Sequence, residues 1–446
     1  MGLIARYRKI PILYRMLGAF IIGALVGIVC WYAESKHGFA LKSSLDVWLS
    51  PFGLVLVKML KMIVVPLIFF SLFQGAASLP LKKFGRIGLR VIVLYLVTSA
   101  LAAIIGTLFA LGINPGKGGM QLTGGDAGAV GAAAANTGAA SLTAVFMSMF
   151  ENPFKALADG NFLAVIVFAI LSGLALRVLL DAVDEGKQDA DASALAGLTG
   201  LAAAVNRILF VLVDWIMDYA PIGILALTIV NFTLYGPDLA GPYFNIGVGI
   251  IVGIIVMIAV VYSALIRLLA GKSPLKFFKY AQEAMITAFV TRSSGATLPV
   301  TLKTADDLKI RRELADFALP LGATVNMDGV CIHLPMFAIL AANIFGIDLT
   351  FGSLLVLVMT TVLAAVGAGG IPGGSLMLLF IILNSMGLNE AQISQVVAFA
   401  LGINPILDMF ETMNNVTGDL TCTYVVASQE KMLVETDQDP ELIMGY

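Results

Sequence analysis

Charged residues are scarce in this chain, and their scarcity excludes most soluble proteins. Only 13% of its 446 residues are charged, whereas a soluble domain has about a quarter. Hydrophobic residues make up 59% of the chain, and the mean hydropathy is +0.94. The net charge of −2 gives no reason to expect nucleic acid as a partner. We therefore predict an all-α polytopic membrane protein that lies in a lipid bilayer.

Cysteine and histidine are also rare, which excludes the commonest metal sites. We interpret Cys30, Cys331 and Cys422 as small buried residues of apolar segments, and not as a disulfide or metal site. His37 and His333 are too few for a histidine metal centre, and we favour a packing role for His333 although it lies close to the polar part of its span. The sequence has no evident nucleophile–base pair or phosphate-binding loop, so we do not expect an enzyme.

Long apolar runs predict the membrane spans. The first six lie near 15–33, 48–76, 88–113, 141–180, 200–231 and 244–270. Two more, near 313–345 and 391–427, alternate with two apolar segments near 280–300 and 353–385 that Gly, Ser and Pro interrupt. We expect the run at 141–180 to break into shorter helices at Asn152-Pro153 and Asp159-Gly160. The Gly- and Ala-rich segment 113–140 and the acidic segment 181–191 are predicted to be exposed linkers.

The distribution of Lys and Arg predicts the orientation. These residues cluster at 6–15, 82–90, 267–279 and 303–312, and they are absent from 231–244, 345–353 and 386–392. The positive-inside rule makes the first set cytoplasmic and the second external, so both termini are cytoplasmic. The basic residues before the first run favour a first span over a cleaved signal. Eight transmembrane helices fit this orientation if the two interrupted segments are re-entrant helical hairpins on opposite sides, which indicates inverted repeats.

Three polar interruptions within apolar segments predict a binding site. The two hairpin tips read TRSSGATLP at 291–299 and GAGGIPGGS at 367–375. Glycine permits tight turns, and free N–H groups at helix N-termini can bind a carboxylate. The span at 313–345 is interrupted by TVNMDG at 324–329, where an unwound turn would offer oxygens to a hard cation such as Na⁺.

Four polar residues form a stripe in the last span. Asp408, Glu411, Asn415 and Asp419 follow one another at steps of 3, 4 and 4, so they lie on one helical face. A carboxylate at the centre of a membrane helix costs roughly 2.5–3.5 kcal/mol. Three carboxylates on one face would make exposure to lipid unfavourable, and we expect this stripe to face cations or a solute.

In these residues the chain resembles the dicarboxylate/amino-acid:cation symporter family, the glutamate transporter family, and it looks like a bacterial member. The resemblance covers nearly the whole chain and is strongest in TRSS at 291–294, NMDG at 326–329, GIPGG at 370–374 and D-x-x-x-T-x-x-N-x-x-x-D at 408–419. It implies a homotrimer of independently working protomers in the bacterial inner membrane. It also implies an elevator mechanism of alternating access, with the second hairpin as the gate.

The resemblance further implies a division into a static scaffold and a mobile transport domain. The scaffold would consist of 1–87 (spans one and two) and 114–240 (spans four and five). The transport domain would consist of 88–113 (span three) and 241–430 (span six, first hairpin, span seven, second hairpin and span eight). Residues 431–446 would form a cytoplasmic tail.

The family's cation-binding roles fall on oxygen-bearing positions of this chain. Its three sodium sites would be formed by Asn326, Asn415 and Asp419 with the backbone of Gly322; by Tyr95, Thr98, Ser99, Asn326 and Asp328; and by Thr324 and Met327 with carbonyls of the second hairpin. The resemblance therefore implies two or three Na⁺ ions per substrate.

The family's substrate-binding positions imply an α-amino acid. They correspond here to Ser293, Ser294, Val330, Ile371, Gly373, Ser375, Asp408, Glu411, Thr412 and Asn415. Asp408 matches the position that binds the ammonium group. Asn415 and the Ser293–Ser294 backbone match the positions that bind the carboxylate.

The predicted side-chain pocket departs from the pattern of acidic-substrate carriers. Where those carriers have an Arg, this chain has Glu411, and Val330 stands where they have a Thr. At about 4 Å and an effective dielectric near 20, Glu411 would repel an anionic side chain by several kcal/mol. Glu411-Thr412 and Gly373-Gly374-Ser375 instead resemble the serine/threonine:sodium symporter branch. A carboxylate that accepts a hydroxyl hydrogen bond contributes roughly 1.5–3 kcal/mol. We therefore predict sodium-coupled symport of serine or threonine.

Several alternatives remain open at this point. Glu411 could receive a cationic side chain, or act as a protonatable group in coupling, and a protonated Glu411 would admit a dicarboxylate. Arg292 could neutralise either Glu411 or Asp408. From a different class of protein, the chain could be an ion or anion channel.

Overall fold

The computed structural model describes residues 10–37, 41–77, 81–116, 147, 149–159, 161–184, 192–367, 370 and 372–434. Regular structure in these ranges is helical, apart from one isolated bridge between Ile310 and Leu433. Most of segment 113–140, residues 185–191 of the acidic linker, Ile371 and most of the tail 431–446 lie outside the described residues. The predicted all-α class therefore holds for the described part of the chain.

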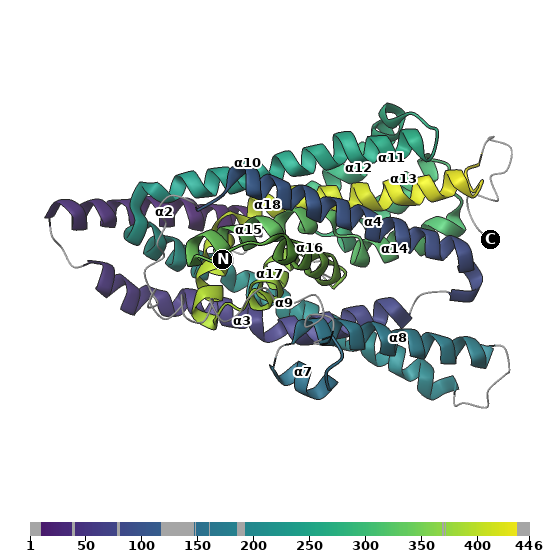
Figure 1. The fold of residues 1–446 in the computed structure, drawn as a ribbon, viewed down its shortest axis with the longest axis horizontal. Coiled ribbons are helices and arrows are strands. Elements are labelled where there is room, and N and C mark those ends of the chain that lie inside the picture. Colours follow the sequence, from purple (N-terminus) through teal and green to yellow (C-terminus); the bar gives the residue numbers. More distant parts are fainter. Residues whose placement is uncertain are drawn as a thin grey trace.

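Most helices lie lengthwise in an elongated bundle (Figure 1). In chain order they are α2 (Ile12–His37), α3 (Leu41–Ala77), α4 (Leu81–Ile113), α7 (Pro153–Asp159), α8 (Phe162–Asp184), α9 (Ala192–Tyr235), the 3₁₀ turn η1 (Gly236–Leu239), α10 (Ala240–Val256), the π-helix η2 (Met257–Tyr262), α11 (Ser263–Leu268), α12 (Pro274–Thr291), α13 (Ser294–Asp307), α14 (Arg312–Val325), α15 (Asp328–Phe345), α16 (Phe351–Ala365), α17 (Gly374–Ser385) and α18 (Glu390–Gln429).

The helices pack in two groups. In the first group α9 packs on α2 and α3, and α3 packs on α8. In the second group α4 packs on α10, α15 and α16, while α18 packs on α12, α14 and α15. Figure 1 shows α3 and α8 along the lower side of the molecule and α4 and α10 along the upper side. The chain first enters the second group at α4, returns to the first group with α8 and α9, and enters the second group again at η1, which contacts both α9 and α10.

Apolar helices confirm the prediction of a multi-pass membrane protein. Within the described residues, 7 helical stretches are long and apolar enough to cross a membrane, and one of them, Ser193–Leu268, has 76 residues. A straight helix of that length would measure about 114 Å, whereas a bilayer core is roughly 30 Å thick. Because η1 divides this stretch into α9 and α10–α11, which pack in different groups, it has the length for two crossings. The count of eight spans stays a prediction.

The helices break where polar or glycine-rich motifs interrupt the apolar runs. The run predicted at 141–180 divides at Asp159–Phe162 between α7 and α8, and the span at 313–345 divides at Asn326 and Met327 between α14 and α15. The helices α12 and α13 pack on each other as one hairpin, and α16 and α17 pack as the other. The predicted interruptions are therefore present in the fold.

Asp181 corrects the prediction of a solvated linker at 181–191. This residue belongs to α8 and is 6% exposed. Its Oδ1 accepts a hydrogen bond from Arg177 Nε at 2.8 Å. The i,i+4 ion pair between Arg177 and Asp181 stabilises α8 at its C-terminal end, and α8 ends at Asp184, one turn beyond the predicted apolar run.

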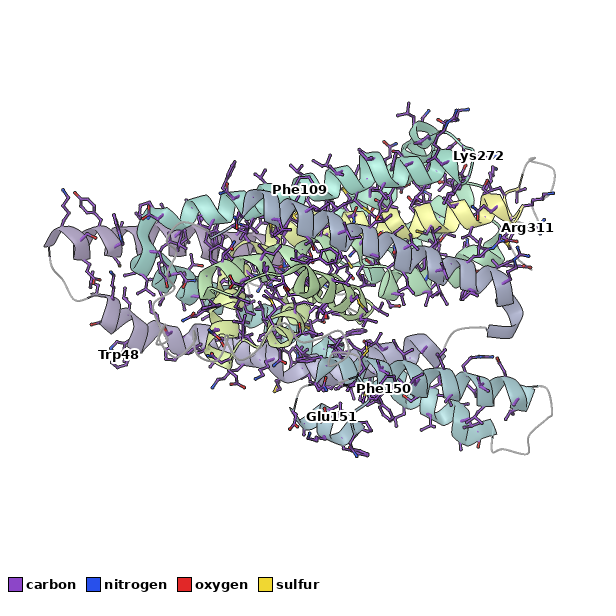
Figure 2. All side chains as sticks on the ribbon, viewed as in Figure 1. Trp48, Phe109, Phe150, Glu151, Lys272 and Arg311 are labelled. Carbon is purple, nitrogen blue, oxygen red and sulfur yellow. The ribbon has the colours of Figure 1, made fainter. Side chains whose placement is uncertain are left out.

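The labelled basic residues gather at one end of the bundle. Figure 2 shows Lys272 and Arg311 at this end and Trp48 at the other. Which end faces the cytoplasm stays a prediction.

Candidate functional site

The unwound turn between α14 and α15 places polar groups in the middle of the second helix group. Asn326 and Met327 have non-helical backbone angles (φ −96°, ψ 85° and φ −112°, ψ 57°). Asn326 is fully buried, and Asp328 begins α15 with no exposed surface. A carboxylate in the first turn of a helix is stabilised by the positive end of the helix dipole. The turn thus presents an amide and a carboxylate to the interior.

The Asp328 carboxylate is held from two sides by buried hydroxyl groups. Ser99 Oγ, from α4, donates to Oδ1 at 2.8 Å. Tyr262 OH, from the π-helix η2, donates to Oδ2 at 2.7 Å. The role of Tyr262 was not predicted, because its only signal in the sequence is a phenol within an apolar run. Short π-helical stretches often occur at functional sites, and this one directs Tyr262 towards Asp328.

A second set of predicted sodium-site residues meets around Asn326. Thr98 Oγ1 donates to Asn326 Oδ1 at 3.1 Å, and Asn326 Nδ2 donates to Asp419 Oδ1 at 3.0 Å. A Cβ added at Gly322 would lie 2.6 Å from Asp419 Oδ1 and 2.7 Å from Tyr95 OH. The close approach of these two side chains therefore requires glycine at this position. Hard oxygen atoms that converge in a buried place form a suitable environment for Na⁺.

The remaining predicted sodium ligands are only partly brought together. Asn415 Nδ2 contacts Met327 Sδ at 3.2 Å, and Asn415 Oδ1 accepts from Gly329 N at 2.7 Å. Thr324 Oγ1 donates to the carbonyl of Leu321 at 2.9 Å, within its own helix. Asn415 therefore joins α18 to the start of α15, whereas the Thr324 hydroxyl bonds locally.

A cavity lies between the hairpin tips, the unwound turn and α18. Its lining residues are Ser294, Met327, Val330, Gly370, Gly374, Ser375, Asp408, Glu411, Thr412 and Asn415. Seven of the ten predicted substrate-binding residues are among them. Of the three predicted residues that do not line the cavity, Gly373 and Ser293 lie beside it, and Ile371 lies outside the described residues.

The two hairpin tips touch each other next to this cavity. Ser293 Oγ donates to the carbonyl of Gly370 at 3.0 Å and also accepts from Ala296 N at 3.2 Å, as the N-cap of α13. Gly370 has φ +63°, and a Cβ there would lie 2.3 Å from the carbonyl oxygen of Ala323. Only glycine allows the second tip to pass this close to α14.

Asp408 interacts with both tips. Its Oδ2 accepts a hydrogen bond from Gly373 N at 3.1 Å, and Arg292 Nε lies 3.8 Å from the same oxygen. Arg292 and Asp408 are both buried. Of the two partners considered for Arg292, the structure therefore brings it to Asp408.

Glu411 forms a buried pair with His333. His333 Nδ1 lies 2.6 Å from Glu411 Oε1, and the two side chains are 0% and 1% exposed. The imidazole also packs against Phe337, with ring centroids 4.7 Å apart. The interpretation of His333 as a packing residue is therefore incomplete. No sequence signal links the pair, because 78 residues separate its members.

A cavity bounded by two hairpins and an interrupted helix, within an apolar bundle, is the arrangement of a secondary transporter. Comparison with known families identifies which kind. Residues 12–429 match the Sodium:dicarboxylate symporter family, and the chain belongs to this family. Its members are transporters.

Curated relatives cover nearly the whole chain but carry different names. The proton/sodium-glutamate symport protein of Bacillus subtilis is 27% identical over 418 residues, which cover 92% of this chain and 91% of that protein. The serine/threonine transporter SstT of Bifidobacterium adolescentis is 28% identical over 413 residues, covering 90% and 86%. Excitatory amino acid transporter 1 of Ambystoma tigrinum is 29% identical over 456 residues, covering 90% and 80%. At these identities the names do not decide the substrate.

Proposed function

We propose that this transporter is a sodium-coupled symporter of a neutral amino acid, and that its substrate is serine or threonine. The observation that carries the proposal is the position of Glu411 in the wall of the cavity. An acidic substrate side chain about 4 Å from this carboxylate would be repelled by several kcal/mol, whereas a hydroxyl group could donate a hydrogen bond to it.

The main chain of an amino acid has complementary partners in the same cavity. Asp408 would bind the ammonium group, and it lies beside Gly373 at the second tip. Asn415 and the backbone at Ser294, where the 14-residue helix α13 begins, would bind the carboxylate. The N-terminus of a helix favours a bound anion. Val330, Ser375 and Thr412 would surround a short side chain.

Sodium coupling is supported by the buried oxygens next to the cavity. Ser99 donates directly to Asp328, and Asn326 donates to Asp419 while it accepts a hydrogen bond from Thr98. The name of the family and the name of the Bacillus relative both include sodium. We propose that two or three Na⁺ ions bind among these oxygens as co-transported substrates.

Alternating access would use the two helix groups as separate bodies. The group of α2, α3, α8 and α9 would be the static scaffold, and α4 with α10–α18 would be the mobile transport domain. Both hairpins, the unwound turn and the polar stripe of α18 belong to the second group, so such a movement would carry the complete site. We propose an elevator in a homotrimer, with eight spans and both termini on the cytoplasmic side of a bacterial inner membrane.

The proposal is tested with the purified full chain in proteoliposomes. Labelled serine uptake is measured under an inward Na⁺ gradient and after replacement of Na⁺ by choline, with unlabelled serine, threonine, alanine, lysine, aspartate and malate as competitors. We expect concentrative uptake only with Na⁺ and the strongest competition from serine and threonine. Sodium-independent binding, or preference for aspartate or malate at neutral pH, would refute the proposal. Current without concentrative uptake would identify a channel.

A further inference from the structure

The His333–Glu411 bond involves one of the two ring nitrogens of His333 and one of the two carboxylate oxygens of Glu411. The bond joins His333 Nδ1 to Glu411 Oε1. His333 Nε2 and Glu411 Oε2 are buried without a hydrogen-bond partner among the described residues. Unpaired buried polar atoms are uncommon in folded proteins and call for an explanation. Here the carboxylate with the unpaired oxygen also lines the cavity.

Among the described residues, His333 is the one side chain that forms a hydrogen bond or ion pair with Glu411. Arg292, from the tip between α12 and α13, is paired with Asp408. Asp408 itself lies one helical turn before Glu411 on α18 and has Gly373 N as its second partner. His333, on α15, is thus the side chain that fixes the orientation of the Glu411 carboxylate. A bond through Oε1 leaves Oε2 as the carboxylate oxygen without a partner among the described residues.

We propose that His333 is a positioning residue for substrate selection, which holds Glu411 through Nδ1 so that Oε2 accepts a hydrogen bond from the substrate side chain. The inference rests on the proposed function and extends it. It assigns the selection for a side-chain hydroxyl group to a pair on two helices, not to Glu411 alone. An amino acid of similar size without a donor, such as alanine, leaves Oε2 unpaired and is transported less well.

Two polar substitutions of His333 separate positioning from packing. The amide nitrogen of Asn is as many bonds from Cα as His Nδ1, whereas that of Gln is one bond further away. We therefore expect His333→Asn to retain most of the ratio of serine to alanine kcat/KM. We expect His333→Gln to lower this ratio roughly tenfold, as for loss of one hydrogen bond to a charged group. Both variants are compared at equal amounts of folded protein.

A double-substitution cycle tests whether His333 acts through Glu411. Glu411→Gln alone should lower the serine-to-alanine ratio, and His333→Gln should have no further effect in that background. An unchanged serine-to-alanine ratio in His333→Gln would overturn the inference. So would an equal decrease of this ratio by His333→Gln in the wild-type and in the Glu411→Gln background. If His333→Gln is not recovered folded, Glu411→Asp replaces it, because the shorter side chain draws the carboxylate away from His333 Nδ1. Glu411→Asp should lower the serine-to-alanine ratio. A ratio equal to that of the wild type would overturn the inference.

The substrate preference of the wild-type protein shows whether the proposed function fails independently of this inference. If its preferred substrate is not serine or threonine, the proposed function is wrong. The ratio is then measured between the preferred substrate and its analogue without the side-chain donor. Dependence of that ratio on His333 and on Glu411 together still supports the positioning role, and independence still overturns it.

Discussion

Ser99 Oγ donates to Asp328 Oδ1 at 2.8 Å, and this bond joins the middle of α4 to the first residue of α15. The two residues are 229 positions apart and are both buried. The bond ties a helix that precedes the connection through η1 to the unwound turn that follows it. A cation bound near Asp328 would therefore interact with groups fixed by three separate elements, α4, η2 and the turn.

Replacement of Asp328 by Asn should weaken sodium binding. The amide has the size of the carboxylate but carries no charge. Only its oxygen can accept a hydrogen bond, so the NH₂ group would face one of the hydroxyl groups of Ser99 and Tyr262 that donate to Asp328. We expect the Na⁺ concentration for half-maximal serine uptake to rise at least about tenfold. As a control, Asp316→Asn removes an exposed carboxylate paired with Arg312 and should change this value little. Equal sodium dependence in Asp328→Asn and the wild type would contradict the assignment.

Replacement of Tyr262 by Phe should also weaken sodium binding, but without removing a charge. The substitution removes only the hydroxyl that donates to Asp328 Oδ2 at 2.7 Å. A hydrogen bond to a charged group contributes about 1.5–3 kcal/mol, so the sodium concentration for half-maximal uptake should rise about tenfold or more. Tyr280→Phe, at an exposed position of α12, is the matched control. If both variants behave alike, the Tyr262 hydroxyl has no part in cation binding.

These residues show what the sequence could and could not predict. The interruptions at 291–299 and 324–329 were predictable because glycine and polar residues are conspicuous within apolar runs. Asp328 and Asp419 were predictable as site residues because a carboxylate in a membrane span needs a partner. The cavity lined by Asp408 and Glu411 agrees with this expectation.

The partners of these carboxylates were not predictable. Tyr262 and His333 carry ordinary side chains within apolar helices, and their roles depend on long-range packing that no local pattern encodes. The same holds for Arg292, which could have reached Asp408 or Glu411 and which packs beside Asp408. The sequence thus indicated the positions of the unusual residues but not the pairs that they form.

Reversal of the charge at Glu411 should change the substrate. Arg in place of Glu411 would remove the acceptor for a hydroxyl group and present a cation to the cavity. We expect Glu411→Arg to lose serine uptake and to gain inhibition by an acidic amino acid, measured by competition with labelled substrates. Glu283→Arg makes the same change of charge at an exposed site paired with Lys303 and should preserve serine uptake. Serine uptake that survives Glu411→Arg would refute this account of the pocket.

The N-terminal cap of α18 should contribute to stability without affecting selectivity. Asn389 Oδ1 accepts from Gln392 N at 3.0 Å, and Gln392 Oε1 accepts from Asn389 N at 2.9 Å, which forms a capping box. Loss of such a cap costs about 0.5–2 kcal/mol. We expect Asn389→Ala to lower the thermal unfolding temperature in detergent and to leave the serine-to-alanine ratio unchanged. Asn389→Asp, which retains a capping oxygen, should restore the unfolding temperature.

A methyl group at Gly322 should disturb the sodium site from within. The added carbon would lie 2.6 Å from Asp419 Oδ1 and 2.7 Å from Tyr95 OH, so one of these groups must move. Overpacking of a buried site lowers the free energy of unfolding by about 1–3 kcal/mol. Displacement of the Asp419 or Tyr95 oxygen would also move it away from a bound cation. We expect Gly322→Ala to raise the sodium requirement for serine uptake about tenfold or more.

The control for Gly322 is another helical glycine. At Gly352, in α16, the nearest atom to an added carbon is Thr350 Oγ1 at 3.8 Å, which is an ordinary contact. Gly352→Ala should leave the sodium requirement unchanged and should not destabilise the helix, because alanine is the better helix former. An unchanged sodium requirement in Gly322→Ala, with the protein recovered folded, would mean that Asp419 and Tyr95 do not need their close approach for cation binding. The oxygens around Asn326 would then have a structural role only.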